Sequence, residues 1–330
     1  MIKSLFFLSI SWYNLIGEYM KKITKKILNT VSKIDVDTIN NYEKERVLHD
    51  IIGMTFLKKY HYVDTRILVQ NHTVGVRLFF PKEKTNKLII YFHGGGWVVG
   101  SASNYTRTCD HLAVTTNSIV ISVDYRLAPE FPFPNAVIDC YCVTKYFYSK
   151  ESFLDIDEKN IVLMGDSAGG NLAAVVSYIS SIKKDFQVKN QILLYPLTYH
   201  DHSNNSPFAS IQDNGEDWIL TTKRINEYMK LYVKEEQYIG SPYVAPLNAK
   251  DLKNQPRTLI ITAELDPLRD EGEAYGYKLR DFKNEVSIHR IKDMIHGFFS
   301  INKNSKANKE CYQIICDFLS GDEKDEKKMV

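Results

Sequence analysis

Residues 165–169 (GDSAG) form a GxSxG motif with Ser167 at its centre. The motif follows an apolar run at 161–164 (IVLM) and precedes a helix-forming run at 171–179 (NLAAVVSYI). A serine on such a tight strand-to-helix turn exposes its hydroxyl, and the glycines on either side let neighbouring backbone approach closely. We call residues 165–169 the nucleophile turn and predict Ser167 as a nucleophile. The alternative is a glycine-rich turn that holds a serine by chance.

A second glycine-rich segment, the glycine loop at residues 93–97 (HGGGW), follows the apolar run 87–92 (KLIIYF). Consecutive glycines allow successive N–H groups to point the same way, which makes a pocket for an oxyanion. We therefore predict Gly94 and Gly95 as oxyanion donors, with the N–H of Ala168, at the start of the next helix, as a third. A phosphate-binding loop is the alternative, but neither GxGxxG nor GxxxxGK followed by Ser or Thr occurs here.

A nucleophilic serine needs a base, and nine histidines compete for that role. His296 follows the late apolar run 286–291, which places it on a loop at the same sheet edge as Ser167. His289 lies inside that run, and His93 belongs to the glycine loop. His200 and His202 follow another strand and are closer competitors, but the chain order Ser, then Asp or Glu, then His favours His296.

Asp266 follows the apolar run 258–263 (TLIITA) and is the predicted acid. Its role would be to hold the imidazole of His296 in one tautomer and to stabilise the imidazolium without taking its proton. Other carboxylates lie nearby in the sequence, and a loop carboxylate is often a solvated group or a helix cap. These alternatives are Glu264, Asp270, Glu271 and Asp293.

The elements that must position these residues alternate between strands and helices. An expected hairpin, 65–70 and 74–80, is followed by buried strands separated by helix-compatible segments. This order predicts an α/β fold with a mostly parallel sheet, helices on both faces, and a site at the carboxyl ends of the strands. The expected strands are 87–92, 118–123, 161–164, 191–195, 258–262 and 286–291.

The domain organisation is predicted to be one continuous body, because no internal repeat or linker-like segment occurs. Residues 1–57 are expected to hold an N-terminal segment and cap helices, with the helices at 21–57. Residues 58–320 are expected to form the α/β domain, with a cap insertion at about 200–238 that contains a helix at 222–233. Both cap segments would cover the strand ends. Residues 321–330 are expected to form a solvated charged tail.

Composition excludes several classes of function. With 330 residues, 44% of them hydrophobic, the chain can bury a large core. Its 42 basic and 40 acidic residues are too balanced for a general nucleic-acid surface. The five cysteines are odd in number and form no CxxC pair, as in a reduced cytoplasmic protein. We expect no disulfide, no metal site and no cofactor, because HExxH and metal-type spacings are also missing.

The apolar segment at 5–16 (LFFLSISWYNLI) has two interpretations. It is too short to span a bilayer, which takes about 20 apolar residues. Residues 1–19 could precede the natural start, with Met20 opening a typical bacterial beginning (MKKITKKILN). The other interpretation is a weak membrane-associating segment. We favour a cytoplasmic protein without stable membrane contact.

The chain resembles the hormone-sensitive-lipase-like family of α/β hydrolases, also called the bacterial family IV esterases. Four segments carry the resemblance: the glycine loop, DYRLAPE at 124–130, GDSAGGN at 165–171, and DPLRDEG at 266–272 followed by HGF at 296–298. The resemblance implies the α/β-hydrolase fold with a helical cap that selects the substrate.

The resemblance also assigns roles. Ser167, Asp266 and His296 are implied as nucleophile, acid and base, with Gly94, Gly95 and Ala168 as oxyanion donors. It implies that DYRLAPE, with Asp124, Arg126 and Glu130, is a structural turn held by internal ion pairs, and that Asp166 supports the site without reacting.

The implied function is a serine carboxylesterase that hydrolyses short- to medium-chain esters through an acyl-enzyme, without a cofactor. A small-molecule ester would be its partner, and the family also suggests a homodimer. Two alternatives stay open. One is an amidase or arylformamidase, and the other is a non-catalytic ligand-binding member of the fold, which the presence of His296 disfavours.

Overall fold

The computed structural model describes residues 37–54, 60–149, 151–216, 219–301 and 304–326. The predictions for residues 1–19, the apolar segment 5–16 and a start at Met20 therefore lie outside the described residues. Among the described residues, no helix combines the length and the apolar character needed to cross a membrane.

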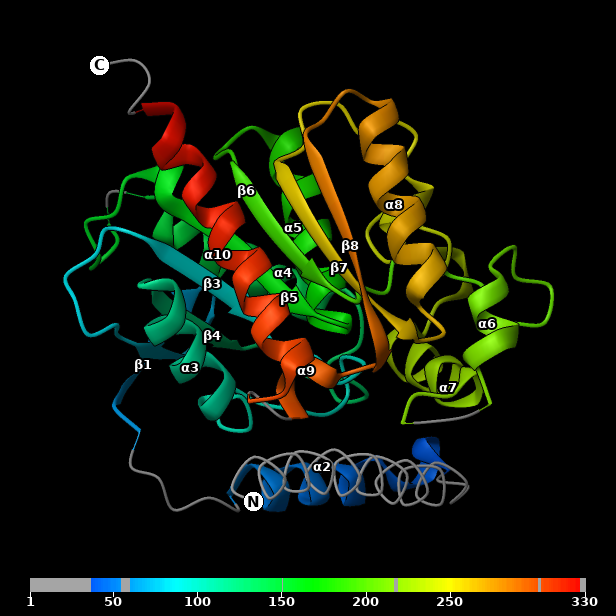
Figure 1. The fold of residues 1–330 in the computed structure, drawn as a ribbon. Coiled ribbons are helices and arrows are strands. Elements are labelled where there is room, and N and C mark those ends of the chain that lie inside the picture. The colour runs from blue at the N-terminus through cyan, green and yellow to red at the C-terminus, as the bar shows by residue number, and fades with distance from the viewer. Residues whose placement is uncertain (1–36, 55–59, 150, 217–218, 302–303, 327–330) are drawn as a thin grey trace, which may run out of the picture.

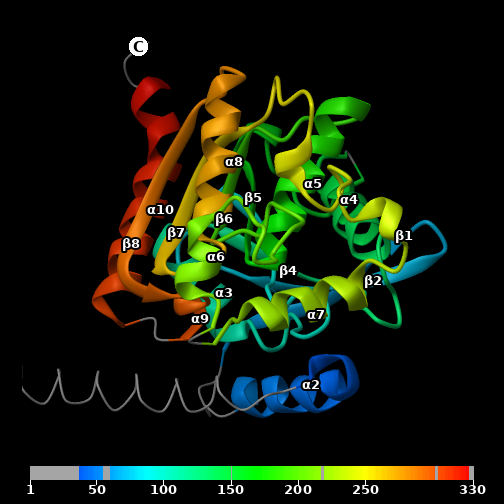
Figure 2. The same cartoon turned by 90° about the vertical axis from the view of Figure 1, so that its right-hand side faces the viewer.

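The core of the molecule is one eight-stranded sheet in the order β1-β2-β4-β3-β5-β6-β7-β8. Figure 1 shows the sheet between its helices, and β2 is labelled in Figure 2. Strand β2 runs antiparallel to both β1 and β4, and the other neighbours are parallel. The predicted hairpin and the predicted mostly parallel sheet are confirmed. The strands are β1 (Tyr62–Val69), β2 (His72–Phe79), β3 (Leu88–Phe92), β4 (Ile119–Asp124), β5 (Ile161–Asp166), β6 (Asn190–Leu194), β7 (Arg257–Leu265) and β8 (Val286–Ile295).

Helices cover both faces of the sheet, as Figure 2 shows around its β8 edge. Helices α3 and α10 pack on one face, and α4, α5 and α8 on the other. The helices are α2 (Thr38–Met54), α3 (Thr106–Thr116), α4 (Asn135–Phe147), α5 (Ala168–Lys183), α6 (Ala209–Asn214), α7 (Thr222–Tyr232), α8 (Arg269–Asp281), α9 (Phe298–Ile301) and α10 (Lys306–Glu326), with short 3-10 helices at Glu158–Asn160, Glu236–Tyr238 and Pro246–Asn248.

Two hydrophobic cores explain why the central strands are apolar at every position. In β3, Leu88, Ile90 and Phe92 belong to the core beneath α4, α5 and α8. Ile89 and Tyr91 belong to the core beneath α3 and α10. Successive side chains of a strand point to opposite faces, so a strand buried on both sides reads as one continuous apolar run.

Helices α2 and α7 lie side by side across one end of the sheet (Figures 1 and 2). The Thr38 N–H donates to Glu227 at 3.0 Å, and the Tyr228 hydroxyl donates to Glu45 at 2.8 Å. Arg46 of α2 donates to the carbonyl of Val98, just beyond the glycine loop, at 2.8 Å. The helix expected at 222–233 is thus present as α7, packed with α2 over this loop.

The DYRLAPE segment is held differently from the prediction. Arg126 pairs with Asp139 of α4 at 2.7 Å, and Glu130 pairs with Arg46 of α2 at 2.8 Å. Asp124 accepts the N–H of Ala102 at 3.0 Å. The expected internal ion pairs were therefore wrong. The segment lies between other elements, so its charged side chains pair outward and join α4 and α2 through it.

The C-terminal boundary also differs from the prediction. Helix α10 runs on to Glu326, past the boundary expected at residue 320. The Arg257 guanidinium lies against Gly321, where an added Cβ would come within 2.5 Å of its Nη2 atom. The first part of the segment expected as a tail therefore continues a helix.

The buried Asp139 carboxylate gives a test of this arrangement. It is fully buried and is bonded by Arg126, with His72 at 2.8 Å as a second partner. Replacing Arg126 with Met should lower the free energy of unfolding by about 3 kcal/mol, because breaking a buried pair leaves a desolvated charge. Replacing Lys145 with Met breaks the largely exposed pair with Asp185 and should cost less than about 1 kcal/mol. Urea denaturation measures both, and equal losses would contradict the burial argument.

Candidate active site

Ser167, His296 and Asp266 form a hydrogen-bonded chain. The Ser167 Oγ lies 2.9 Å from Nε2 of His296, and Nδ1 of His296 lies 2.8 Å from Oδ2 of Asp266. Asp266 is fully buried, and its other carboxyl oxygen accepts the N–H of Leu268 at 2.9 Å. With Nδ1–H donating to the carboxylate, Nε2 is left as an acceptor directed at the serine hydroxyl. The structure thus brings together three residues that lie far apart in the sequence.

The sheet places these residues at one edge. Ser167 stands between β5 and α5, Asp266 directly follows β7, and His296 directly follows β8. These strands run parallel to one another, so their carboxyl ends lie together. Ser167 has φ 55° and ψ −122°, a strained conformation for a residue with a side chain. Its N–H donates to the carbonyl of Leu194 at 2.9 Å, which helps to hold the turn.

Close backbone approach explains the glycines of the nucleophile turn. A Cβ added to Gly169 would lie 2.0 Å from the Phe92 carbonyl oxygen, at the end of β3. A Cβ added to Gly165 would lie 2.3 Å from the Gly169 carbonyl oxygen. The predicted reason for glycine at these positions is confirmed. The close contact between the nucleophile turn and the end of β3 places the glycine loop, which follows β3, beside Ser167.

The glycine loop supplies N–H groups, but they differ from the predicted set. The Gly94 N–H donates to the Asp166 carboxylate at 2.9 Å, so the structure gives this predicted donor another partner. Within the described residues, the N–H groups of Gly95 and Ala168 have no acceptor. The N–H of Gly96, which the sequence analysis missed, is equally free among those residues. Gly95 has φ +118°, in the region that favours glycine.

A buried cluster beneath this loop was also missed by the sequence analysis, apart from Asp166. Hydroxyls of Tyr91 and Tyr105 donate to the Asp166 carboxylate, each at 2.8 Å. Burial raises the pKa of Asp166, and the hydrogen bonds from the two tyrosines and the Gly94 N–H oppose that rise. Neither tyrosine belongs to a motif, so only the fold shows that they converge on Asp166.

Aromatic side chains enclose the site. The Tyr195 ring packs edge-on against the imidazole of His296, with centroids 4.9 Å apart. From helix α7, Tyr232 stacks on Trp97 at 4.3 Å, and Tyr228 lies against Gly96, where an added Cβ would come within 2.4 Å of its ring. Rings from α7 therefore cover the outer side of the glycine loop.

The competing residues of the sequence analysis have other partners. His202 pairs with the buried Glu271 at 2.8 Å, and His200 accepts from Asn248 at 3.0 Å. His93 bonds the Gly94 carbonyl at 2.8 Å, and His289 is exposed on β8.

The competing carboxylates also have other partners. Asp270 pairs with Arg269 at 2.7 Å, while Glu264 accepts the N–H of Asp293 at 2.8 Å. Among the described residues, none of these competing side chains makes a hydrogen bond to Ser167 or to His296.

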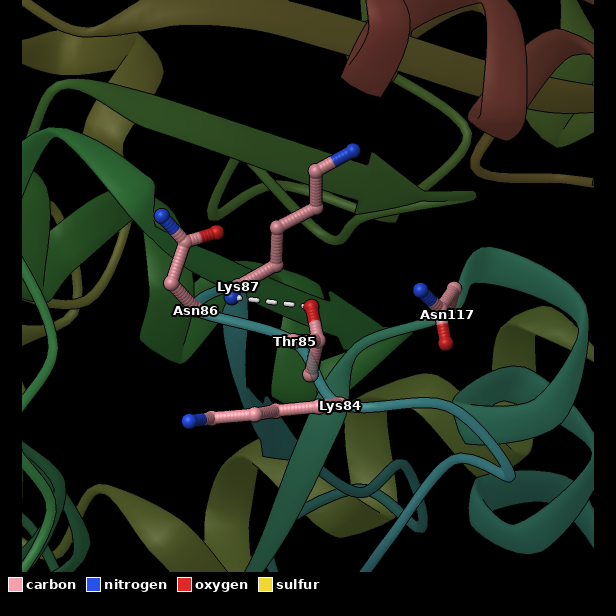
Figure 3. A pocket seen from close by; sticks show the side chains of 5 residues that line it. All are labelled: Lys84, Thr85, Asn86, Lys87 and Asn117. Carbon is pink, nitrogen blue, oxygen red and sulfur yellow. Dashed lines mark hydrogen bonds between the residues drawn. The ribbon is translucent and has the colours of Figure 1, made fainter.

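A surface hollow with a volume of about 410 Å³ is shown in Figure 3, and none of the residues that line it is Ser167, Asp266 or His296. It is lined by Lys84, Thr85, Asn86, Lys87 and Asn117, beside the starts of β3 and β4. The starts of parallel strands lie at the opposite edge of the sheet from Ser167.

Among the described residues, no group of three or more His, Cys, Asp or Glu side chains is placed to hold a metal ion.

Comparison with known proteins gives consistent matches. A family model described as "alpha/beta hydrolase fold" matches residues 89–300. An arylesterase of Saccharolobus solfataricus is 34% identical over 245 residues, covering 74% of this chain and 78% of that protein. Esterase LipI of Mycobacterium tuberculosis is 32% identical over 282 residues, covering 84% and 87%. An esterase structure from Pyrobaculum calidifontis has a TM-score of 0.78 at 33% identity, covering 90% of this chain and 97% of that one.

Gly169 gives a test of the close approach between β3 and the nucleophile turn. In Gly169→Ala, the new Cβ must displace the Phe92 carbonyl, which lies 2.0 Å from its position, and the glycine loop with it. We expect labelling of Ser167 by a fluorophosphonate to slow by at least about 100-fold, because a shift of about 1 Å in a site has that scale of effect.

Gly272→Ala is the matched control. Gly272 lies inside α8, and the nearest atom to an added Cβ is at 3.4 Å, an ordinary contact. This variant should keep wild-type labelling and gain up to about 1 kcal/mol of stability from helix propensity. Thermal unfolding checks that both variants fold. Wild-type labelling in Gly169→Ala would show that the approach does not constrain the site.

Proposed function

The chain belongs to the α/β hydrolases, within the hormone-sensitive-lipase-like group of esterases, and we propose that it is a serine carboxylesterase acting on short- to medium-chain esters. The observation that carries the proposal is the Ser167–His296–Asp266 chain, with contacts of 2.9 and 2.8 Å. A nucleophile, a base and an orienting acid in this geometry suit acyl transfer. The named relatives are esterases, which favours an ester over an amide.

Acylation begins with a proton transfer. Nε2 of His296 accepts the Ser167 proton as Oγ attacks the ester carbonyl carbon, and a tetrahedral oxyanion forms. Asp266 stabilises the imidazolium and remains ionised. The carbon–oxygen bond to the alcohol then breaks, and His296 gives its proton to the leaving alkoxide. Water, activated by His296 in the same way, attacks the acyl-enzyme and releases the acid and free Ser167.

The oxyanion would be held by N–H groups of Gly95 and Ala168, with Gly96 as a further candidate. These donors have no acceptor among the described residues, whereas the Gly94 N–H is bonded to Asp166. Backbone donors fixed before the reaction stabilise developing charge without having to reorganise. The originally expected donor Gly94 is instead proposed to orient the loop.

Two further parts of the proposal concern the cellular location and the oligomeric state of the enzyme. We propose a cytoplasmic location, which the five free cysteines support, since Cys109, Cys140 and Cys311 are buried as thiols. A homodimer is proposed from the family resemblance alone. The substrate itself would be a small-molecule ester, chosen by the cap formed around α2 and α7.

The first test is hydrolysis of p-nitrophenyl esters from acetate to laurate by wild type and Ser167→Ala. Wild type should turn over the shorter chains, and the variant should lose on the order of 10⁶ in kcat, as when a serine protease loses its nucleophile. Circular dichroism confirms that both are folded. A folded wild type that hydrolyses no ester would overturn the proposal and direct attention to amides or to ligand binding.

Asp266→Asn tests the orienting acid. An amide donating to Nδ1 would move the imidazole proton to Nε2, so that His296 could no longer accept the serine proton. We expect kcat to fall by about 10⁴. Asp270→Asn is the control, because Asp270 contacts Arg269 and Ser210 and makes no bond to His296. Steady-state kinetics with p-nitrophenyl acetate measure kcat for both variants. An equal fall in kcat in the two variants would contradict the assignment of Asp266 as the orienting acid.

A further inference from the structure

The peptide units of the glycine loop are fixed by buried polar groups behind it. In a trans peptide unit, the C=O of one residue and the N–H of the next point in opposite directions. The Gly94 carbonyl accepts from Nδ1 of His93 at 2.8 Å. The Gly95 N–H of the same unit therefore points the opposite way, away from His93, and is free of protein acceptors among the described residues.

The preceding peptide unit is clamped at both ends. Its carbonyl, from His93, accepts the Tyr125 hydroxyl at 2.7 Å. Its N–H, from Gly94, lies between two acceptors, Oδ1 of Asp166 at 2.9 Å and the hydroxyl of Tyr105 at 3.1 Å. Tyr105 in turn donates to Oδ2 of Asp166 at 2.8 Å. The three groups form a closed triangle of hydrogen bonds.

This triangle joins the two parts of the chain that bear the free N–H groups. Asp166 directly precedes Ser167 and is two residues before Ala168, while Gly94 directly precedes Gly95. Asp166 is 3% exposed, so water does not compete for its oxygens as it would at the surface. The carboxylate thus sets the distance between the glycine loop and the nucleophile turn.

We propose that Asp166 and Tyr105 are positioning residues for the oxyanion site, acting through the N–H of Gly94. They fix the unit before Gly95, so that the Gly95 N–H and the Ala168 N–H converge on one point. The inference rests on the proposed esterase function and deepens it. It also accounts for the difference between the predicted and observed partners of Gly94.

Tyr105→Phe tests the proposal, and Tyr91→Phe is its matched control. Both changes remove one hydroxyl that donates to Asp166 at 2.8 Å, but only Tyr105 also contacts the Gly94 N–H. Tyr105→Phe should lower kcat about tenfold, less than the 100-fold or more lost with a whole oxyanion donor. KM and the pH dependence of kcat/KM should stay close to wild type. Tyr91→Phe should keep kcat within about twofold.

A second measurement separates positioning from a general structural effect. A trifluoromethyl ketone forms a tetrahedral adduct with Ser167, and its affinity should fall with kcat/KM in Tyr105→Phe only, because the adduct carries the oxyanion. Equal effects of the two variants, or a rise in KM with kcat unchanged, would overturn the inference. A shifted pH profile would also overturn it, because that would place the effect on His296.

Hydrogen exchange gives a readout that does not need activity. Mass spectrometry of the peptide that covers residues 93–100 should show faster amide exchange in Tyr105→Phe than in wild type, and no change in Tyr91→Phe. If wild type hydrolysed no ester, the proposed function would fail while this comparison still tested the clamp. Unchanged exchange in Tyr105→Phe would overturn the clamp even in an active esterase.

Discussion

The close approach of the nucleophile turn to the end of β3 is the constraint on which the rest of the site depends. At Gly169 the two backbones lie too close for any side chain, since an added Cβ would lie 2.0 Å from the Phe92 oxygen. This contact sets the glycine loop, which continues from Phe92, beside Ser167. It also places Asp166 within 2.9 Å of the Gly94 N–H, so one carboxylate can hold both parts of the site. Without the approach, the free N–H groups and the nucleophile would lie apart.

Two buried carboxylates near Ser167, those of Asp266 and Asp166, have hydrogen-bond partners of different kinds. Asp266 bonds the imidazole of His296 and the N–H of Leu268, so its charge faces a group that becomes positive during acyl transfer. Asp166 is surrounded by neutral donors from Tyr91, Tyr105 and Gly94, which satisfy its oxygens without supplying a full charge. Burial raises its pKa, and these donors oppose the rise. In the proposed mechanism the first carboxylate supports proton transfer, and the second fixes the position of the glycine loop.

Local patterns predicted the parts of the molecule that depend on local physics. Apolar runs predicted six strands of the sheet, and the expected hairpin predicted β1 and β2. GxSxG with its flanks predicted Ser167, because the turn is built from residues next to one another. The partners of Arg126, Glu130 and Gly94 were not predictable in this way. Each is a choice between polar groups that lie far apart in the sequence, and the choice depends on how α2, α4 and the nucleophile turn pack. The contacts of the two tyrosines with Asp166 were not predictable for the same reason. In the sequence, Tyr91 looks like an ordinary core residue of β3.

The glycine loop is held on two sides, and these contacts link helices α2 and α7 to the proposed oxyanion site. On its inner side lie Asp166 and Tyr105, and on its outer side Tyr228 and Tyr232 of α7. Arg46 of α2 bonds the Val98 carbonyl directly after the loop, at 2.8 Å. Under the proposed function, a bulky substrate that displaced α2 or α7 would therefore act on the same backbone that carries the Gly95 N–H. The inner clamp opposes that displacement, because the Gly94 N–H is tied to the sheet through Asp166 at the end of β5. In the proposed mechanism, substrate choice by the cap and stabilisation of the oxyanion would thus depend on the same short stretch of chain, residues 93–98.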